Sequence, residues 1–105
     1  MKKKKEVIEF HAEFCKTFSN PTRLEILGLL KSGEMTVSDI TEKLGIPKAN
    51  VSQHLTIMRM MRIFKTRREG TKIYYRIANK KLSQACGLMQ NALAQLIKGV
   101  PMLKV

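Results

Sequence analysis

The chain has 105 residues, of which 44% are hydrophobic, and this is enough for a single domain with one modest core. Twenty Lys and Arg against eight Asp and Glu give a formal net charge of +12, which favours nucleic acid over an anionic membrane surface as the partner. No apolar run is long enough to span a bilayer, and acidic residues interrupt the segment after the N-terminal lysines, so we expect a cytoplasmic protein with no membrane partner.

Two helices are predicted in the first third of the chain. The apolar residues of segment 4–18 recur at steps of three and four, which is the period of a helix with one apolar face: Val7, Phe10, Phe14 and Phe18. In the stretch SNPTRLEILGLLKSGE that follows, Ser19 or Asn20 can cap a helix whose first residue is Pro21. The residues of this helix expected to face the core are Leu24, Ile26, Leu27, Leu29 and Leu30. Gly33 is expected to end it.

A helix-turn-helix is predicted over residues 36–61. Thr36 and Asp39 form the capping pattern T-V-S-D at the start of a short helix, and Gly45-Ile46-Pro47 ends that helix. A further helix then begins near Lys48. Two short helices joined by a tight turn that contains Gly are typical of this motif.

The second helix of the motif, in PKANVSQHLTIMR, contains no acidic residue. Val51, Leu55 and Met58 form an apolar stripe along one side of it. In a helix-turn-helix this helix lies in the major groove of DNA, where amide side chains can bond to adenine and hydroxyls can meet bases or phosphates. The residues that we expect to contact DNA from it are Lys48, Asn50, Ser52, Gln53, Thr56 and Arg59. Asn50, Gln53 and Thr56 are the expected base readers, while Lys48 should contact the backbone and Ser52 either one.

His54, in the same helix, lies at the edge of the apolar stripe. Because of this position, we interpret it as a partly buried histidine that hydrogen-bonds the scaffold and not as a metal ligand. No metal site and no cofactor is predicted.

After Arg62 the pattern changes to that of a β-hairpin, or wing, over residues 63–77. Glu69-Gly70-Thr71-Lys72 is expected to form its turn, and Tyr74 and Tyr75 are expected to pack the hairpin on the core. The wing cations that we expect to contact phosphates are Lys65, Arg67, Arg68 and Lys72.

A last helix is predicted from residue 79, with Gly99 and Pro101 at its end. The first and last helices have more apolar surface than a chain of this length can cover, so segments 1–18 and 79–98 are expected to pair with a second copy. The predicted fold is therefore mainly α with a small β-hairpin wing, in one domain over residues 1–105.

Three blocks of the sequence resemble the ArsR-type winged helix-turn-helix repressors: S-N-P-T-R-L-E-I-L, V-S-Q-H-L and R-R-E-G-T-K-I-Y-Y. The resemblance covers most of the chain between residues 18 and 77. It implies a homodimer, built on the first and last helices, that binds operator DNA and is released by an inducer. The sequence departs from the family at Arg62, where the family commonly has Gly.

The resemblance does not identify an inducer. Thr36-Val37-Ser38 stands where soft-metal sensors often have C-V-C, and the last helix lacks the Asp and His that zinc and nickel sensors use. Sensors of sulfur species have a cysteine at the position of Gly28. Cys15 and Cys86 lie on the two predicted dimer helices, so two interpretations stay open: a thiol switch, or cysteines that only fill space.

Two further classes of function were compared with operator binding. A winged-helix module that binds protein would use the same fold, but it would show little salt-dependent affinity for duplex DNA. An enzyme is not predicted, because the sequence has no Ser/His/Asp or Cys/His constellation, no paired carboxylates and no phosphate-binding Gly loop.

Overall fold

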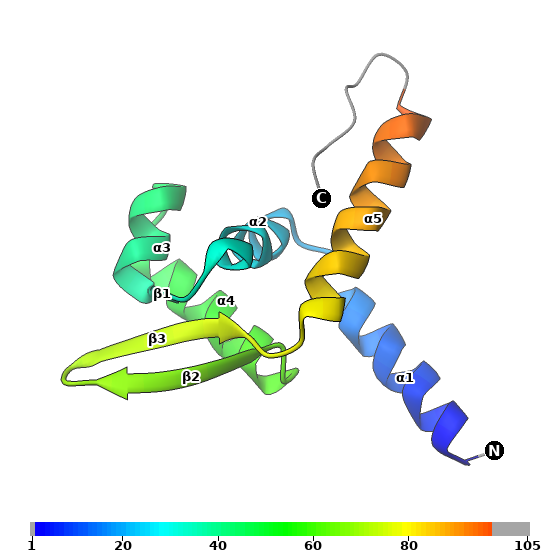
Figure 1. Cartoon of the computed structure of the whole chain (residues 1–105), viewed down its shortest axis with the longest axis horizontal. Helices are drawn as coiled ribbons and strands as arrows, with labels where there is room; N and C mark the ends of the chain where they lie inside the picture. The colour runs from blue at the N-terminus through cyan, green and yellow to red at the C-terminus, as the bar shows by residue number, and fades with distance from the viewer. Residues whose placement is uncertain (1, 98–105) are drawn as a thin grey trace.

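The computed structural model of the protein describes residues 2–97. Within this range the elements follow in the order α1 (Lys2–Thr17), α2 (Pro21–Leu29), the short 3₁₀ helix η1 (Leu30–Ser32), β1 (Met35–Thr36), α3 (Val37–Leu44), α4 (Lys48–Met60), β2 (Phe64–Glu69), β3 (Lys72–Ile77) and α5 (Lys80–Leu96). Figure 1 shows the β2–β3 hairpin extending to one side with α3 above it, α1 and α5 on the opposite side, and α2 and α4 between them. The predicted class, mainly α with a β-hairpin wing, is confirmed.

Local capping chemistry explains where the central helices begin and end. The Asn20 side chain accepts a hydrogen bond from the Arg23 amide at 3.2 Å, and Pro21 occupies the first turn of α2. Thr36 and Asp39 form the predicted capping box at the start of α3. Gly45 ends α3 in the left-handed conformation, with φ of 66°. These boundaries were predicted from the sequence and are confirmed.

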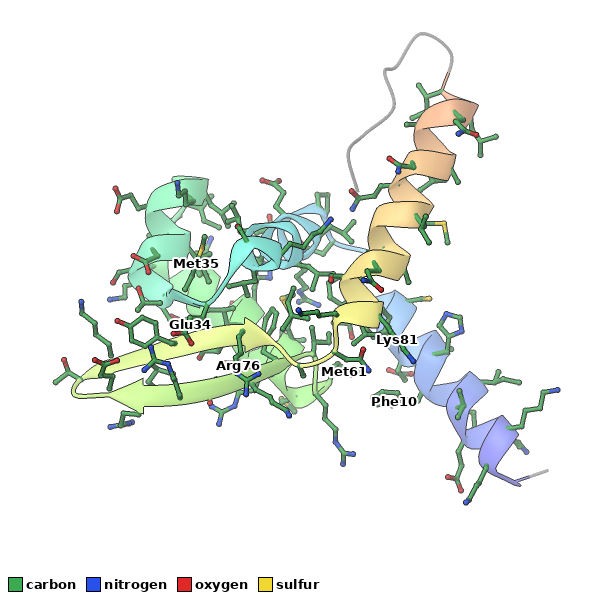
Figure 2. All side chains as sticks on the ribbon, viewed as in Figure 1. Phe10, Glu34, Met35, Met61, Arg76 and Lys81 are labelled. Carbon is green, nitrogen blue, oxygen red and sulfur yellow. The ribbon has the colours of Figure 1, made fainter. Side chains whose placement is uncertain are left out.

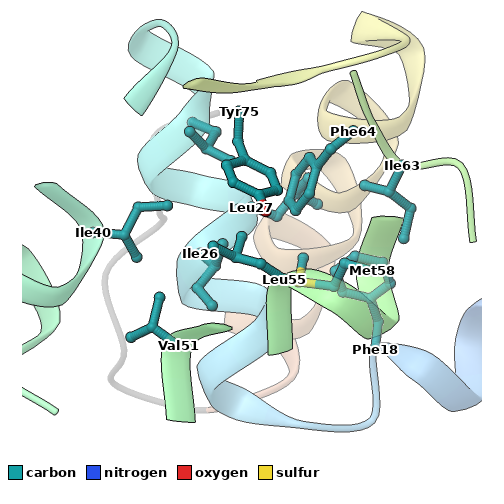
Figure 3. Close-up of a cluster of buried hydrophobic side chains, with 11 residues drawn as sticks. Phe18, Ile26, Leu27, Ile40, Val51, Leu55, Met58, Ile63, Phe64 and Tyr75 are labelled. Carbon is teal, nitrogen blue, oxygen red and sulfur yellow. The ribbon is translucent and has the colours of Figure 1, made fainter. Parts of the chain in front are cut away.

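The hydrophobic core lies between α2, α3, α4 and the inner face of the hairpin (Figure 3). Its fully buried side chains are Ile26, Ile40, Val51, Leu55, Met58 and Ile63. The apolar stripe of α4 is thus completely inside, which fixes the opposite face of that helix outward. The predicted core residues of α2 all contribute, with Leu24 and Leu29 only partly buried.

Helices α1 and α5 cover little of this core. Phe18 is buried and Phe14 packs against it at 4.9 Å between ring centroids, but Val7 and Phe10 are 67% and 50% exposed. On α5, small residues face inward, namely Ser83, Gly87 and Ala94, and larger apolar residues face outward. Gly99 and Pro101, which were expected to end this helix, lie outside the described residues.

The sheet has a third strand that the sequence pattern did not predict. Strand β1 pairs antiparallel with β3, with Met35 opposite Tyr75 and Thr36 opposite Tyr74, so β3 is the central strand. Two residues are too few to show an alternating pattern, and the capping box at this point of the sequence indicates the start of a helix and not a strand. Tyr75 packs in the core as predicted, but Tyr74 lies on the opposite face of the sheet, because successive residues of a strand alternate.

Arg62, between α4 and β2, has a left-handed backbone with φ of 61°, and no other non-glycine residue between positions 2 and 97 has a positive φ. Its amide donates to the Arg59 carbonyl at 2.9 Å, which closes the turn after α4. A residue with a Cβ is strained there, because its side chain crowds the following carbonyl. The family's glycine would remove that strain.

Replacing Arg62 with Gly should therefore raise the free energy of unfolding by about 1 kcal/mol. Urea denaturation measures this as a higher midpoint at unchanged slope. The matched control is Arg62→Ala, which removes the same charge but keeps the Cβ and should give no such gain. Equal stabilisation by both variants would show that charge, and not backbone strain, is responsible.

Candidate nucleic-acid interface

Helix α4 presents an exposed polar face with no acidic residue. The six side chains predicted to contact DNA from this helix are all exposed: Lys48, Asn50, Ser52, Gln53, Thr56 and Arg59. Pro47 provides no side-chain cap, so the positive end of the helix dipole is open toward solvent. The result is a helix with a buried apolar side and an outer side that offers only amide, hydroxyl and cationic groups.

The Thr56 side chain already forms one hydrogen bond within α4. Its hydroxyl donates to the Ser52 carbonyl at 2.9 Å, so the hydroxyl proton is already in use. The residue as a whole is exposed. Thr56 is therefore better placed to contact a thymine methyl or to accept a hydrogen bond than to donate one.

Helix α4 is held at its middle by a histidine. The Nδ1 atom of His54 accepts a hydrogen bond from Arg23 Nε at 3.1 Å, and Arg23 Nη1 also donates to the Thr17 carbonyl at 3.1 Å. Burial, and then the neighbouring Arg23 charge, lower the pKa of His54. Because a protonated imidazole could not accept this bond, His54 is neutral here. The interpretation of His54 as a scaffold residue is confirmed.

The wing carries its cations on both faces. Lys65, Arg67 and Lys72 share the outer face with Arg76, and Arg68 lies on the other face near the turn. Lys65, Arg68 and Lys72 are exposed, and within residues 2–97 none of them forms an ion pair. These three cations are free to meet an external anion.

Arg67 differs from the other wing cations because carboxylates of this chain surround it. Its Nε lies 3.0 Å from both oxygens of Glu34, and its Nη1 donates to Glu69 at 2.7 Å. The guanidinium also lies over the Tyr74 ring, 4.3 Å from the centroid. Sequence reasoning placed Arg67 among the phosphate contacts, and it could not reveal Glu34, which is 33 positions away.

The two cysteines lie where α1 and α5 were predicted to pair. Cys15 is exposed, and Cys86 is half-buried against the core. Burial, and then the proximity of Cys15, raise the pKa of Cys86. A raised pKa disfavours the thiolate that disulfide exchange requires, so the packing role of Cys86 is favoured and the thiol switch stays a prediction.

No group of three or more His, Cys, Asp or Glu between residues 2 and 97 is arranged to hold a metal ion. None of the helices that the structure describes is long and apolar enough to cross a membrane.

A helix-turn-helix with an acid-free outer helix, followed by a basic hairpin, defines a winged helix-turn-helix domain. Residues 20–65 match the family model of the bacterial regulatory proteins of the arsR family. The chain is 40% identical over 76 residues to the transcriptional repressor SdpR of Bacillus subtilis, an alignment covering 72% of this chain and 84% of SdpR. The protein belongs to the arsR family.

Two other relatives extend this comparison. The transcriptional regulator KmtR of Mycobacterium tuberculosis is 40% identical over 72 residues, which are 69% of this chain and 55% of KmtR. The chain thus spans about half the length of that relative. The solution structure of a homodimeric winged helix-turn-helix DNA-binding domain from Mycobacterium bovis superimposes with a TM-score of 0.81 and 30% identity, covering 91% of this chain and 89% of that one.

Proposed function

We propose that this protein is a homodimeric, sequence-specific DNA-binding repressor of transcription whose operator is an inverted repeat. The observation that carries the proposal is the outer face of α4, exposed, uncapped and free of acidic residues on a chain of net charge +12. Relatives that are named transcriptional repressors, among them SdpR, support the same activity. Operator DNA would place the protein in the cytoplasm.

The contacts divide into base readers and phosphate contacts. Asn50 and Gln53 have free amides that can bond bidentately to adenine, and Thr56 presents its methyl group. Ser52 can reach a base or a phosphate. The phosphate contacts that we propose are Lys48, Arg59, Lys65, Arg68 and Lys72. Phosphate contacts fix the position of the protein on the duplex, while the base readers set the preferred sequence.

The partner for the dimer is a second copy of this chain, which would cover α1 and α5. The large apolar side chains exposed on these two helices are Val7, Ile8, Phe10, Leu88, Met89, Leu93, Leu96 and Ile97. Figure 2 shows Phe10 projecting from α1. So much apolar surface is unusual for a monomer, and the M. bovis domain of the same fold is homodimeric. A twofold dimer would present two copies of α4 to half-sites about one helical turn, or a multiple of it, apart.

Gln53→Ala should reduce affinity for the preferred duplex by about 1–3 kcal/mol and relax the preference at one base pair of each half-site. The preferred duplex is first selected by the wild-type protein from a random-sequence library. Binding is then measured by fluorescence anisotropy on that duplex and on single-base variants of it. The matched control, Lys72→Ala, should weaken binding to every duplex equally and lower the salt slope by about 0.9. Unchanged base preference in the Gln53 variant would show that Gln53 does not read a base.

The alternative is a winged-helix module that binds protein and not DNA. Titration of duplex DNA at two salt concentrations separates the two functions, because several phosphate contacts give a steep salt dependence and a protein-binding module gives almost none. Weak, salt-independent binding to all duplexes would exclude the repressor.

A further inference from the structure

The outer face of the wing contains a compact group of four side chains, here named the Arg67 cluster: Glu34, Arg67, Glu69 and Tyr74. Glu34 belongs to the segment between η1 and β1, whereas the other three belong to the hairpin. Figure 2 shows Glu34 beside the hairpin. Arg67 thus adds side-chain bonds between the hairpin and the segment that leads into β1, beside the backbone pairing of β1 with β3.

The geometry of the cluster restrains Arg67 in several directions at once. Two of its nitrogens, Nε and Nη2, face the Glu34 carboxylate, while Nη1 bonds to Glu69 and the ring of Tyr74 covers one side of the guanidinium. Such paired bonding requires the planar fork of Arg, and a Lys ammonium could not reproduce it. The bond from Arg67 is the main cause that lowers the pKa of Glu34, so both groups are charged at neutral pH.

A two-stranded hairpin has little rigidity of its own. Here β1 supplies only two residues of pairing, opposite Tyr74 and Tyr75, and the turn at Gly70 lies beyond them. The Glu34–Arg67 pair lies level with that pairing and ties β2, the strand that β1 does not pair with, to the segment before β1. The orientation of the hairpin in turn sets the positions of its unpaired cations, which are Lys65, Arg68 and Lys72.

The same contacts argue against Arg67 as a phosphate contact. Two carboxylates already bond the one guanidinium, so the charge of Arg67 is compensated within the chain, and a phosphate would have to displace Glu34 to bond it. We infer that Glu34 and Arg67 form a positioning pair, which holds the wing in the orientation that DNA binding requires. Neither residue of the pair contacts DNA itself. This inference rests on the proposed function and replaces the sequence-based expectation for Arg67.

Glu34→Gln separates the two roles, because they predict opposite changes in affinity. If Arg67 positions the wing, losing the Glu34 charge should weaken binding about fivefold to tenfold and lower the salt slope by about 1–2, although no cation was removed. If Arg67 contacts phosphate, the same change frees Arg67 and removes an acid, so affinity should rise. Binding is measured on the selected duplex at several salt concentrations.

Arg67→Lys adds a second comparison. A phosphate contact tolerates Lys, whereas the positioning pair needs the guanidinium fork, so we expect Arg67→Lys to lose as much affinity as Arg67→Gln. Glu25→Gln is the matched control: Glu25 is an exposed carboxylate on α2 that forms no ion pair within residues 2–97, and its loss should leave the salt slope unchanged. Thermal melts by circular dichroism establish that each variant is folded at the assay temperature.

The outcomes are distinct. If the wild-type protein shows no salt-dependent binding to duplex DNA, both the proposed function and the positioning role fail. If the wild-type protein binds and Glu34→Gln binds equally well or more tightly, the positioning role is overturned and the repressor function stands. Loss of affinity and of salt slope in Glu34→Gln and Arg67→Lys together supports the positioning pair.

Discussion

Replacing Leu93 with Glu should convert the dimer into monomers and lower affinity for the inverted-repeat operator by about 100-fold or more. Leu93 is a large apolar residue on the outward face of α5, 47% exposed in the single chain, and we propose that a second copy covers it. A carboxylate there would have to be buried without a partner, which is costly. The two α4 helices would then bind their half-sites independently, and the increase in affinity that comes from linking them in one dimer would be lost.

Sedimentation velocity measures the oligomeric state, and anisotropy on full and half operators measures the affinity. The matched control is Gln84→Glu, which places the same charge at an exposed polar position of α5 and should leave the dimer intact. A Leu93→Glu protein that remains dimeric would show that α5 does not form the interface. Half-site binding is expected to survive in Leu93→Glu, because α4 and the wing are unchanged.

Leu55→Ala should lower the free energy of unfolding by about 2–5 kcal/mol. Leu55 is completely buried in the stripe that attaches α4 to the core, and the small side chain would leave a cavity beneath the proposed recognition helix. For a domain of this size such a loss is a large part of the total stability, so operator binding should fall because less protein is folded. Urea denaturation, followed by circular dichroism, gives the change directly.

Met60 provides the control on the same helix. It is 77% exposed, so Met60→Ala should change stability by less than about 0.5 kcal/mol. Similar losses in the two variants would mean that α4 is not anchored by its apolar stripe.

Much of the architecture follows from local sequence signals. The Asn20 cap with Pro21, the Thr36–Asp39 capping box and the left-handed Gly45 each act within a few residues, so the sequence shows them directly. The buried stripe of α4 follows from helical spacing alone. These signals predicted both helices of the helix-turn-helix and the direction in which the polar face of α4 points.

The features that the sequence did not reveal depend on residues that are distant along the chain. Glu34 and Arg67 are 33 positions apart, and Arg23 and His54 are 31 apart, so no local pattern pairs them. Arg67 was therefore interpreted from its charge and its place on the wing, as a phosphate contact. Strand β1 was missed for a related reason, since its two residues are defined by pairing with β3 and not by their own alternation.

Arg23 connects three helices through its guanidinium: it belongs to α2, bonds the carbonyl of Thr17 at the end of α1, and bonds His54 in the middle of α4. In a dimer paired through α1, this side chain would fix the angle between the twofold axis and each helix that enters the groove. A few hydrogen bonds beside the core of each protomer would then set the distance between the two α4 helices, and with it the spacing of half-sites that the protein accepts. A change in the packing of α1 would alter that spacing without replacing any residue that touches DNA.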